Sequence, residues 1–343
     1  VYAPRIQRKN GFPRRTAQNQ RPLESFRYGE SGDDNKTELL TALSRFCGVE
    51  NFSIPTFYKK REVLIMKKYT TMRFPGFKYK ALTLSYDDDV IFDKKLMEIL
   101  DKHGLKCTFN LNSGLFAEKS GDRRMTEAEA KELFSESRHE IAVHGVKHLS
   151  LLEFDKSVGA QDVLLDRINL ERLFGRVVKG MAYANGSYSD EVVEMLKTCG
   201  IDYARTVVST HRFDIPEDWL RLPATCHHKD EELEKLADEF LKDYPENDHY
   251  LYKHPKLFYL WGHAYEFNDN NNWEIIEKFA EKVGDRDDVW YATNGEIFDY
   301  VKAYDSLIFS VSGNIVKNPS SIDVYTNFNG KETLIRSGET VCL

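Results

Sequence analysis

Carboxylates and imidazoles are concentrated in two short segments of the sequence. Asp87, Asp88 and Asp89 are adjacent, and His144 and His148 are four positions apart. Histidines at this spacing can share one face of a helical turn and direct two ring nitrogens to one point. A divalent transition metal takes such nitrogens together with a carboxylate and a water molecule. We therefore expect a metal site formed by the histidine pair and one aspartate, with a neighbouring aspartate acting as a base.

The acidic run also has other interpretations. Three adjacent carboxylates repel one another unless water or a cation neutralises them. An exposed loop, or a helix start whose dipole favours acids, would serve as well as a metal site. The next predicted helix begins near Phe92, which is late for a helix start at the aspartates.

Three further histidines lie in comparable positions. His263 follows an apolar run, where it could donate a proton to a departing amine or make a structural hydrogen bond at a strand end. His227 and His228 could hold a second metal or contact substrate. We favour the simpler interpretation that they are a strand-end pair, with one ring inside and one outside.

The elements that must position these residues are short apolar runs alternating with amphipathic stretches of helical period. The predicted strands are Ala81–Ser85, Cys107–Leu111, Glu140–Val143, Val177–Ala182, Asp202–Val207, Leu220–Cys226, Leu257–Trp261 and Val289–Ala292. The predicted helices are Phe92–His103, Thr126–Glu136, Lys156–Phe174, Asp190–Cys199, Glu231–Asp243, Trp273–Val283 and Glu296–Tyr304. Such alternation implies parallel strands, and about eight units of this kind imply an α/β barrel.

Cap residues mark several helix boundaries. Thr126 and Glu129 form a capping-box pattern, and Ser189 is placed as an N-cap. Glycines follow three of the predicted helices, where a left-handed residue would end each of them: Gly175, Gly200 and Gly284.

The predicted barrel brings the polar segments together. Active sites of such barrels lie at the carboxyl ends of the strands, and five of the ten histidines lie in the segments after predicted strands. The segments in question are Tyr86–Asp89, His144–His148, Tyr183–Gly186, His227–His228 and Gly262–His263. Two patterns that are weak alone therefore support each other as one site.

The two ends of the chain differ from this middle part. Residues 1–65 open with a stretch rich in Arg, Asn, Gln and Pro that has no period, so we expect an irregular extension, either an interaction arm or a gene-start artefact ahead of Met66. Residues 306–343 show period-two patterning with turn signals at 312–314 and at Asn329-Gly330, which predicts a small antiparallel sheet. The barrel should span 66–305.

Composition limits the classes of function. The 343 residues are 41% hydrophobic and 30% charged with a net charge of −7, which indicates a globular protein and gives no basic footprint for nucleic acid. The five cysteines are scattered, which argues against a disulfide framework. There is no apolar run of about 20 residues and no signal-peptide pattern. We expect a cytoplasmic protein with a carbohydrate or small-molecule substrate and neither nucleic-acid nor membrane partners, in an oligomeric state that the sequence leaves open.

The aspartates and histidines at the predicted strand ends, in this order, resemble the polysaccharide deacetylase family (carbohydrate esterase family 4, with the NodB homology domain). The resemblance extends from Lys68 to Tyr304. The family's Asp-Asp motif is matched by Ser85-Tyr86-Asp87-Asp88, and its H-x-x-x-H motif by His144–His148. Its strand-end histidine is matched in Leu260-Trp261-Gly262-His263, with the leucine one residue further away than usual. The resemblance implies a distorted (β/α)7-8 barrel of NodB type, here with a small C-terminal β appendage.

The resemblance also implies roles for these residues. Asp87 would be the general base and His263 the general acid, while Asp88, His144 and His148 would bind a divalent metal, zinc first and Co²⁺, Ni²⁺ or Mn²⁺ as alternatives. The metal would polarise an N-acetyl carbonyl and activate water. The oxyanion would also meet a backbone N–H of the fourth-strand loop, in which we single out Tyr183 and Asn185.

Three departures from the family pattern concern the surroundings of the metal. Asp89 replaces a glycine. If the backbone has a positive φ at this position, Asp is tolerated there better than most residues. The loop 181–186 lacks the arginine that orients the base, a role that Arg205 or Arg221 could take. The Asp-Trp pair that supports the catalytic histidine has a looser counterpart in Asp218-Trp219, and His228 is a further supporting candidate.

Three hypotheses of function follow. The leading one is a metal-dependent hydrolase that removes N-acetyl groups from amino-sugar polymers or oligosaccharides. The second keeps the metal site but assigns a small non-sugar amide or an O-acetyl ester as substrate. The third, motivated by the altered loop 181–186, is a degenerate barrel that binds carbohydrate without turnover.

Overall fold

The computed structural model describes residues 70–343 except 246, 250 and 251. All of these belong to the second of two units into which the chain divides, Lys67–Leu343. The extension predicted over residues 1–65 lies outside the described residues. No helix in the described part is long and apolar enough to cross a membrane.

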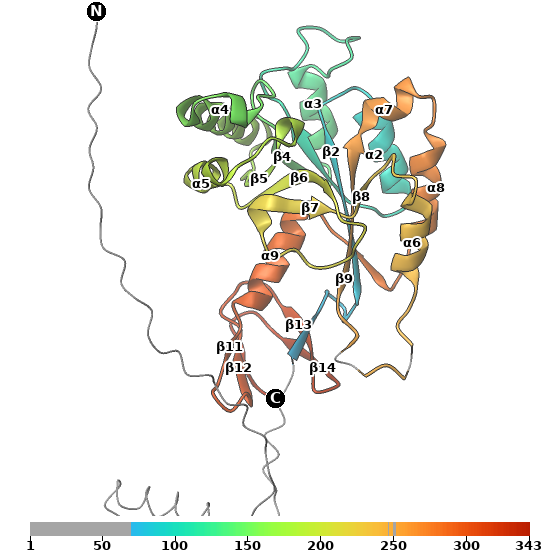
Figure 1. Ribbon diagram of the computed structural model, residues 1–343, viewed down its shortest axis with the longest axis vertical. Coiled ribbons are helices and arrows are strands. Elements are labelled where there is room, and N and C mark those ends of the chain that lie inside the picture. The colour runs from blue at the N-terminus through green and yellow to red at the C-terminus, as the bar shows by residue number, and fades with distance from the viewer. Residues whose placement is uncertain (1–69, 246, 250–251) are drawn as a thin grey trace, which may run out of the picture. The chain divides into compact units, whose positions relative to one another are not determined.

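Parallel strands form the centre of the fold (Figure 1). They are β2 (Lys80–Asp87), β3 (Cys107–Leu111), β4 (Glu140–Val143), β5 (Gly180–Ala182), β6 (Tyr203–Ser209), β7 (Leu222–Ala224), β8 (Cys226–His227), β9 (Lys256–His263) and β10 (Val289–Tyr291). Their order is β7-β6-β5-β4-β3-β2-β9-β8, with β10 beside the first residues of β2. Only Thr225 separates β7 from β8, and its N–H donates to the carbonyl of Tyr259 in β9. One run of chain therefore joins both ends of the sheet, which closes it into the predicted barrel.

Helices cover the outside of the barrel (Figure 1). They are α2 (Asp93–Lys102), α3 (Glu127–Phe134), α4 (Lys156–Phe174), α5 (Asp190–Thr198), α6 (Leu233–Leu241), α7 (Ala264–Asp269), α8 (Glu274–Val283) and α9 (Asn294–Asp305), with short 3-10 turns η2 (Leu151–Glu153), η3 (Ala184–Gly186) and η4 (Trp219–Arg221). Alternate residues of β2, such as Leu82 and Leu84, pack with helix residues such as Leu96 in the larger core. Intervening residues such as Ala81 pack in a second core with Tyr259 of β9.

Polar groups are buried inside the barrel, and they bond one another. Thr83 donates to Asn294 over 2.8 Å, and Asn294 donates to the hydroxyl of Tyr259 over 2.6 Å. The backbone N–H of Gly295 donates to Glu140 at the start of β4. Because a Cβ on Gly295 would lie 2.4 Å from that carboxylate, glycine is required where the amino end of α9 meets the strand. These bonds offset the cost of burying polar groups.

The helix caps confirm most of the boundary predictions. Thr126 and Glu129 form the capping box, and Ser189 accepts from the backbone at the start of α5. Gly175 and Gly200 have positive φ. The prediction for Gly284 is wrong, because its φ is −80°. Glycine is needed there for space, since a Cβ would lie 2.6 Å from the Ala280 carbonyl oxygen.

Antiparallel strands follow the barrel, as the patterning of the tail predicts. β13 (Val324–Phe328) pairs with β14 (Lys331–Ile335) through a turn in which Asn329 and Gly330 both have positive φ, the geometry that matches hairpin twist. β1 (Thr70–Arg73) pairs with β13, so the segment ahead of the barrel adds a strand to the tail. A second small sheet contains β11 (Ile308–Phe309), β12 (Ile315–Lys317) and β15 (Thr340–Cys342).

Candidate metal and catalytic site

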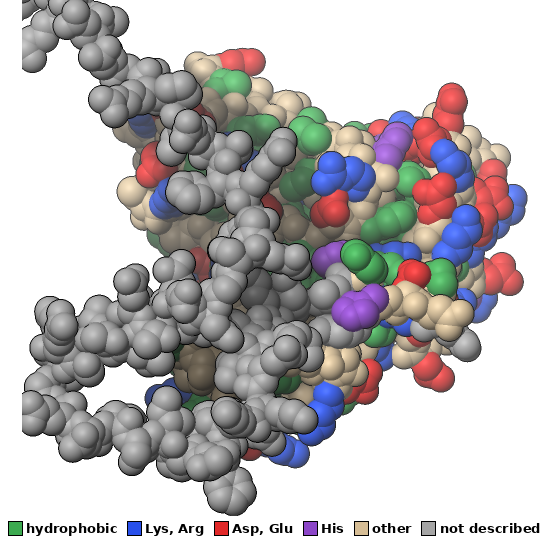
Figure 2. Space-filling model, turned by 60° about the horizontal axis from the view of Figure 1, so that its bottom comes forward, with side chains coloured by type: hydrophobic (Ala, Val, Ile, Leu, Met, Phe, Trp, Pro, Cys, Tyr) green, Lys and Arg blue, Asp and Glu red, His purple; other side chains and the backbone are tan. Residues whose placement is uncertain are grey.

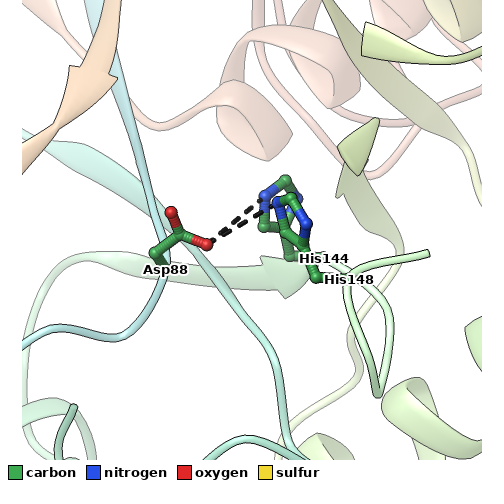
Figure 3. Close-up of side chains that lie close together, drawn as sticks. All are labelled: Asp88, His144 and His148. Atoms are coloured by element: carbon green, nitrogen blue, oxygen red, sulfur yellow. Dashed lines mark ion pairs between the residues drawn. The ribbon is translucent and has the colours of Figure 1, made fainter. Parts of the chain in front are cut away.

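Asp88, His144 and His148 lie together at the carboxyl ends of β2 and β4 (Figure 3). Asp88 Oδ1 is 3.7 Å from His148 Nε2 and 4.0 Å from His144 Nε2. Ligands about 2.1 Å from a tetrahedral metal are roughly 3.4 Å apart. Small side-chain adjustments would therefore bring all three atoms onto one ion, and these residues form one of the groups able to hold a metal.

The protonation of His144 suits a metal ligand. Its Nδ1 is 2.9 Å from the carbonyl oxygen of Ala182. A carbonyl only accepts hydrogen bonds, so Nδ1 carries the proton and Nε2 keeps its lone pair. Nε2 is buried and has no hydrogen-bond partner among the described residues. Burial also lowers the pKa of His144, which favours the neutral ring that metals bind, and a cation would satisfy the orphaned nitrogen.

The two histidines are not on a helical turn, so the predicted conformation is wrong although the two rings do meet. Gly145 and His148 have φ of +84° and +54°, which a right-handed helix excludes. Asp166 of α4 holds the loop by accepting from the backbone N–H groups of His144 and Gly145, over 3.0 and 2.9 Å. A Cβ at Gly145 would lie 2.4 Å from an oxygen of Asp162. Asp162 and Asp166 are both buried on α4, and their spacing of one helical turn was the signal in the sequence that could have indicated this support.

Asp87 is buried beside the metal group and is held from two sides. Asn110 donates to its Oδ1 over 2.8 Å, and Arg205 of β6 donates to its Oδ2. The Arg205 guanidinium also lies over the Trp261 ring, 4.4 Å from the centroid. Burial alone would raise the pKa of Asp87, but Arg205, with His144 and His263, outweighs burial and lowers the pKa to about 2. Asp87 is therefore ionised and fixed in orientation.

Of the two arginines predicted as candidates beside Asp87, Arg205 is the one that pairs with it. The other candidate, Arg221, pairs instead with Asp218 and Asp190. Asp218 also accepts from the backbone N–H of Leu220, and the Trp219 ring packs edge-on against Phe298 with centroids 5.2 Å apart. The supporting role predicted for Asp218 and Trp219 is not realised in these contacts.

Asp89 faces away from the metal group. It has φ of +43°, and Asp88 has φ of +85°, so the positive φ expected at the family's glycine position is present. Asp89 Oδ1 accepts from the backbone N–H of Asn112 over 3.1 Å and from Arg124 over 2.7 Å. Burial raises the pKa of Asp89 to about 7. The turn therefore separates the three carboxylates, which reduces their repulsion.

His263 lies on the other side of the two site aspartates. Its Nε2 is 3.8 Å from Asp87 Oδ2 and 3.9 Å from Asp88 Oδ2. Burial lowers its pKa, but Glu266 and the two aspartates outweigh burial, so the net pKa is raised. A histidine whose pKa is raised and which lies beside a buried carboxylate has the properties expected of a proton donor.

Glu266 is the residue of this region that sequence reasoning left without a role. Its Oε2 is 3.0 Å from His228 Nε2, 3.3 Å from His227 Nε2 and 3.7 Å from His263 Nδ1. His228 is buried and stacked on Phe267, whereas the ring of His227 is partly exposed, as the pair with one ring inside and one outside predicts. The available signal was the spacing His263–Glu266, which lies within one turn when α7 forms.

Tyr183 and Asn185, the two residues predicted to contribute to an oxyanion site in the loop after β5, differ in burial and hydrogen bonding. The N–H of Tyr183 donates to the carbonyl of Arg205, and its hydroxyl donates to the carbonyl of Leu220. Both of its donors are used, so the oxyanion role predicted for Tyr183 is wrong. Asn185 is exposed with φ of +56°, and its role stays a prediction.

On the side of the molecule drawn in Figure 2, the described surface shows no large patch of a single charge sign. Acidic and basic side chains are interspersed there, outside the part that the grey residues cover.

Comparisons with known proteins agree with the residue-level interpretation. Residues 75–204, which contain the acidic run and the histidine pair, match the family model described as polysaccharide deacetylase. No curated protein matches the chain.

Solved structures with similarity include a Streptococcus pyogenes deacetylase, PplD, in complex with acetate (20% identity, 40% of this chain and 62% of that chain, TM-score 0.36). A second is a putative polysaccharide deacetylase from Mycobacterium smegmatis (15% identity, 68% of this chain and 94% of that chain, TM-score 0.48). A third is a CE4 family pseudoenzyme from Bacillus anthracis (16% identity, 66% of this chain and 68% of that chain, TM-score 0.41). This chain thus spans less than two thirds of the streptococcal chain. The family match is therefore to the polysaccharide deacetylases, and it rests on residues 75–204.

Proposed function

We propose that this protein is a metal-dependent deacetylase that removes N-acetyl groups from amino sugars, as oligosaccharides or polymers. The observation that carries the proposal is the buried, unprotonated Nε2 of His144, which has no hydrogen-bond partner among the described residues and lies beside Asp88 and His148. A buried acceptor without a partner is costly unless a ligand satisfies it. Two imidazoles and one carboxylate are the ligands of many catalytic zinc sites.

The metal would contribute Lewis acidity toward the amide carbonyl and lower the pKa of a water molecule. Zinc suits the two nitrogens and one oxygen, and Co²⁺, Ni²⁺ and Mn²⁺ are the alternatives to be tested. The second group of possible ligands, His227, His263 and Glu266, has no assigned part in this step.

Asp87 takes the proton from the attacking water in this proposal. Its ionised form is secured by Arg205, and Asn110 fixes the orientation of the carboxylate. His263, 3.8 Å from Asp87, gives a proton to the departing nitrogen. The carbon–nitrogen bond then breaks with its electron pair on nitrogen, and the products are acetate and a free amine.

Arg205 also bears on the alternative of a degenerate barrel. That hypothesis was motivated by the altered loop 181–186, and the buried Arg205 supplies the arginine that this loop lacks at Asp87. A small non-sugar amide or an O-acetyl ester would use the same residues, so the choice of substrate depends on assay.

The test measures bound metal and acetate release from chitooligosaccharides by the wild-type protein and three variants. His144→Ala should lose both metal and activity, Asp87→Asn should lose activity but keep metal, and the exposed His254→Ala should keep both. Equal metal in wild type and His144→Ala would refute the site. Bound metal without acetate release from any N-acetyl sugar would refute the substrate, and turnover of simple acetyl esters or amides would then identify the alternative.

A further inference from the structure

Glu266 stands at a point where several cationic or titratable side chains converge. Its Oε1 accepts a hydrogen bond from Lys229 Nζ over 2.8 Å. Its Oε2 faces His227, His228 and His263 at 3.0 to 3.7 Å. Glu266 lies in α7, which begins at the residue after His263. The geometry of the helix therefore couples this carboxylate directly to the proposed proton donor.

The two ring nitrogens of His263 face different groups. Nε2 faces the site, with Asp87 at 3.8 Å and Asp88 at 3.9 Å. Nδ1 faces Glu266 at 3.7 Å. Both His263 Nδ1 and Glu266 Oε2 are buried without a hydrogen-bond partner in the described structure. One hydrogen bond between them would satisfy both atoms, and catalytic hydrogen bonds that are long in a free enzyme commonly shorten when substrate binds.

We propose that Glu266 is the positioning residue of His263, accepting a hydrogen bond from Nδ1–H so that Nε2–H points toward the departing nitrogen. It takes the part that the sequence assigned to Asp218 and Trp219, whose contacts lie within η4 and with Phe298. The inference rests on the proposed function, because it needs His263 to be the proton donor.

A second metal ion is the competing interpretation of the same cluster. His227, His263 and Glu266 could supply three ligand atoms. Lys229 already neutralises the carboxylate through Oε1, and a metal on Nδ1 would take the atom through which Glu266 orients the ring. The structure therefore favours positioning, and metal stoichiometry distinguishes the two.

The chemistry offers a readout that general loss of structure would not mimic. An amine leaves only when nitrogen receives a proton as the carbon–nitrogen bond breaks, and in this proposal the proton comes from His263 Nε2. A 4-nitrophenolate leaves an acetyl ester with its electron pair and no proton. Misorientation of His263 should therefore slow amide hydrolysis and leave aryl-ester hydrolysis nearly unchanged.

The experiment compares wild type, Glu266→Gln, Glu266→Asp and the exposed control Glu281→Gln on chitooligosaccharide and on 4-nitrophenyl acetate. Loss of an orienting partner typically costs about 10–100-fold in activity. We expect Glu266→Gln to lower kcat on the amide by about that factor, with KM changed less than about twofold. Its ester activity and metal content should equal those of wild type, and Glu266→Asp should recover part of the amide activity.

The outcomes separate the inference from the proposed function. Equal losses on amide and ester, an effect on KM alone, or no effect would each overturn the positioning role. Two metal ions per chain in wild type and one in Glu266→Gln would show a second metal site instead. A wild-type protein that hydrolyses neither substrate would refute the proposed function itself, and the positioning role would fall with it.

Discussion

Replacing Arg205 with methionine tests how the site keeps Asp87 ionised. The side chains of Arg205 and Asp87 are 1% and 3% exposed, so the substitution leaves a buried carboxylate without its cation. Breaking a buried pair on one side costs about 3–5 kcal/mol. With the arginine absent, burial becomes the dominant influence and raises the pKa of Asp87. We expect a less stable protein whose base is protonated at higher pH.

The depressed pKa of Asp87 in the intact pair sets the size of the expected effect on stability. This pKa is held at about 2, below the ordinary value of 3.8, which corresponds to about 2 kcal/mol of stabilisation. Because the folded pKa is depressed, this stabilisation is fully present above about pH 4 and is lost as pH falls toward about 2. Arg205→Met should remove this contribution and shift the acid limb of the kcat/KM profile upward by more than one pH unit.

The assays are chemical denaturation and kcat/KM against pH on the same chitooligosaccharide. Arg205→Lys keeps a positive charge and should retain the low acid limb with weaker activity, because lysine lacks the forked donors of arginine. Arg221→Met should change neither the stability nor the acid limb much, because Arg221 forms ion pairs with the exposed Asp218 and Asp190. An acid limb that stays in place in a folded, active Arg205→Met would refute the reasoning.

Three further predictions concern the metal loop and can be checked with the same preparations. Asp166→Asn should lower metal affinity about 10–100-fold, because an amide offers one acceptor where the carboxylate oxygens accept from His144, Gly145 and Ser113; unchanged affinity by titration would contradict this support. Gly145→Ala should lower the unfolding free energy by at least about 1 kcal/mol and reduce bound metal, because Gly145 has φ of +84° and Asp162 lies where the Cβ would be. The control Gly175→Ala should lower stability but keep the metal, because Gly175 has φ of +65° and open space around the Cβ. Removing metal with a chelator should lower Tm and abolish activity, and added Zn²⁺ should restore both, because a ligand bound only to the folded state stabilises it; an unchanged Tm would indicate that no metal was bound.

The strand ends of the site were predictable because their causes are local. The apolar runs before Asp87 and His144 are flanked by polar residues, and parallel strands place their carboxyl ends on one rim. The capping box at Thr126 likewise needs only neighbouring residues. Patterns that act within one turn or one strand were therefore visible in the sequence.

The missed features depend on contacts between distant segments. Gly284 looked like a left-handed cap, but the need for glycine comes from the close approach of the Ala280 carbonyl and His103. α7 has only six residues, too few to show a period, so the spacing of Glu266 from His263 was the one local signal that the two side chains lie together. Choosing Arg205 over Arg221 required knowing that Arg205 shares the interior face of β6 with Tyr203.

The position of Arg205 gives a physical reason why the altered loop is compatible with the proposed chemistry. In the parallel pairing of β5 and β6, Arg205 is the register partner of Ala182, which lies in the segment where the family pattern carries its arginine. Neighbouring strands are about 4.8 Å apart, a gap that an arginine side chain can span. A guanidinium on β6 at the same height can therefore reach the same carboxylate, and the Trp261 ring beneath it limits its other orientations. We therefore expect that the proposed chemistry needs a buried cation at Asp87 and that either of these two strands can supply it.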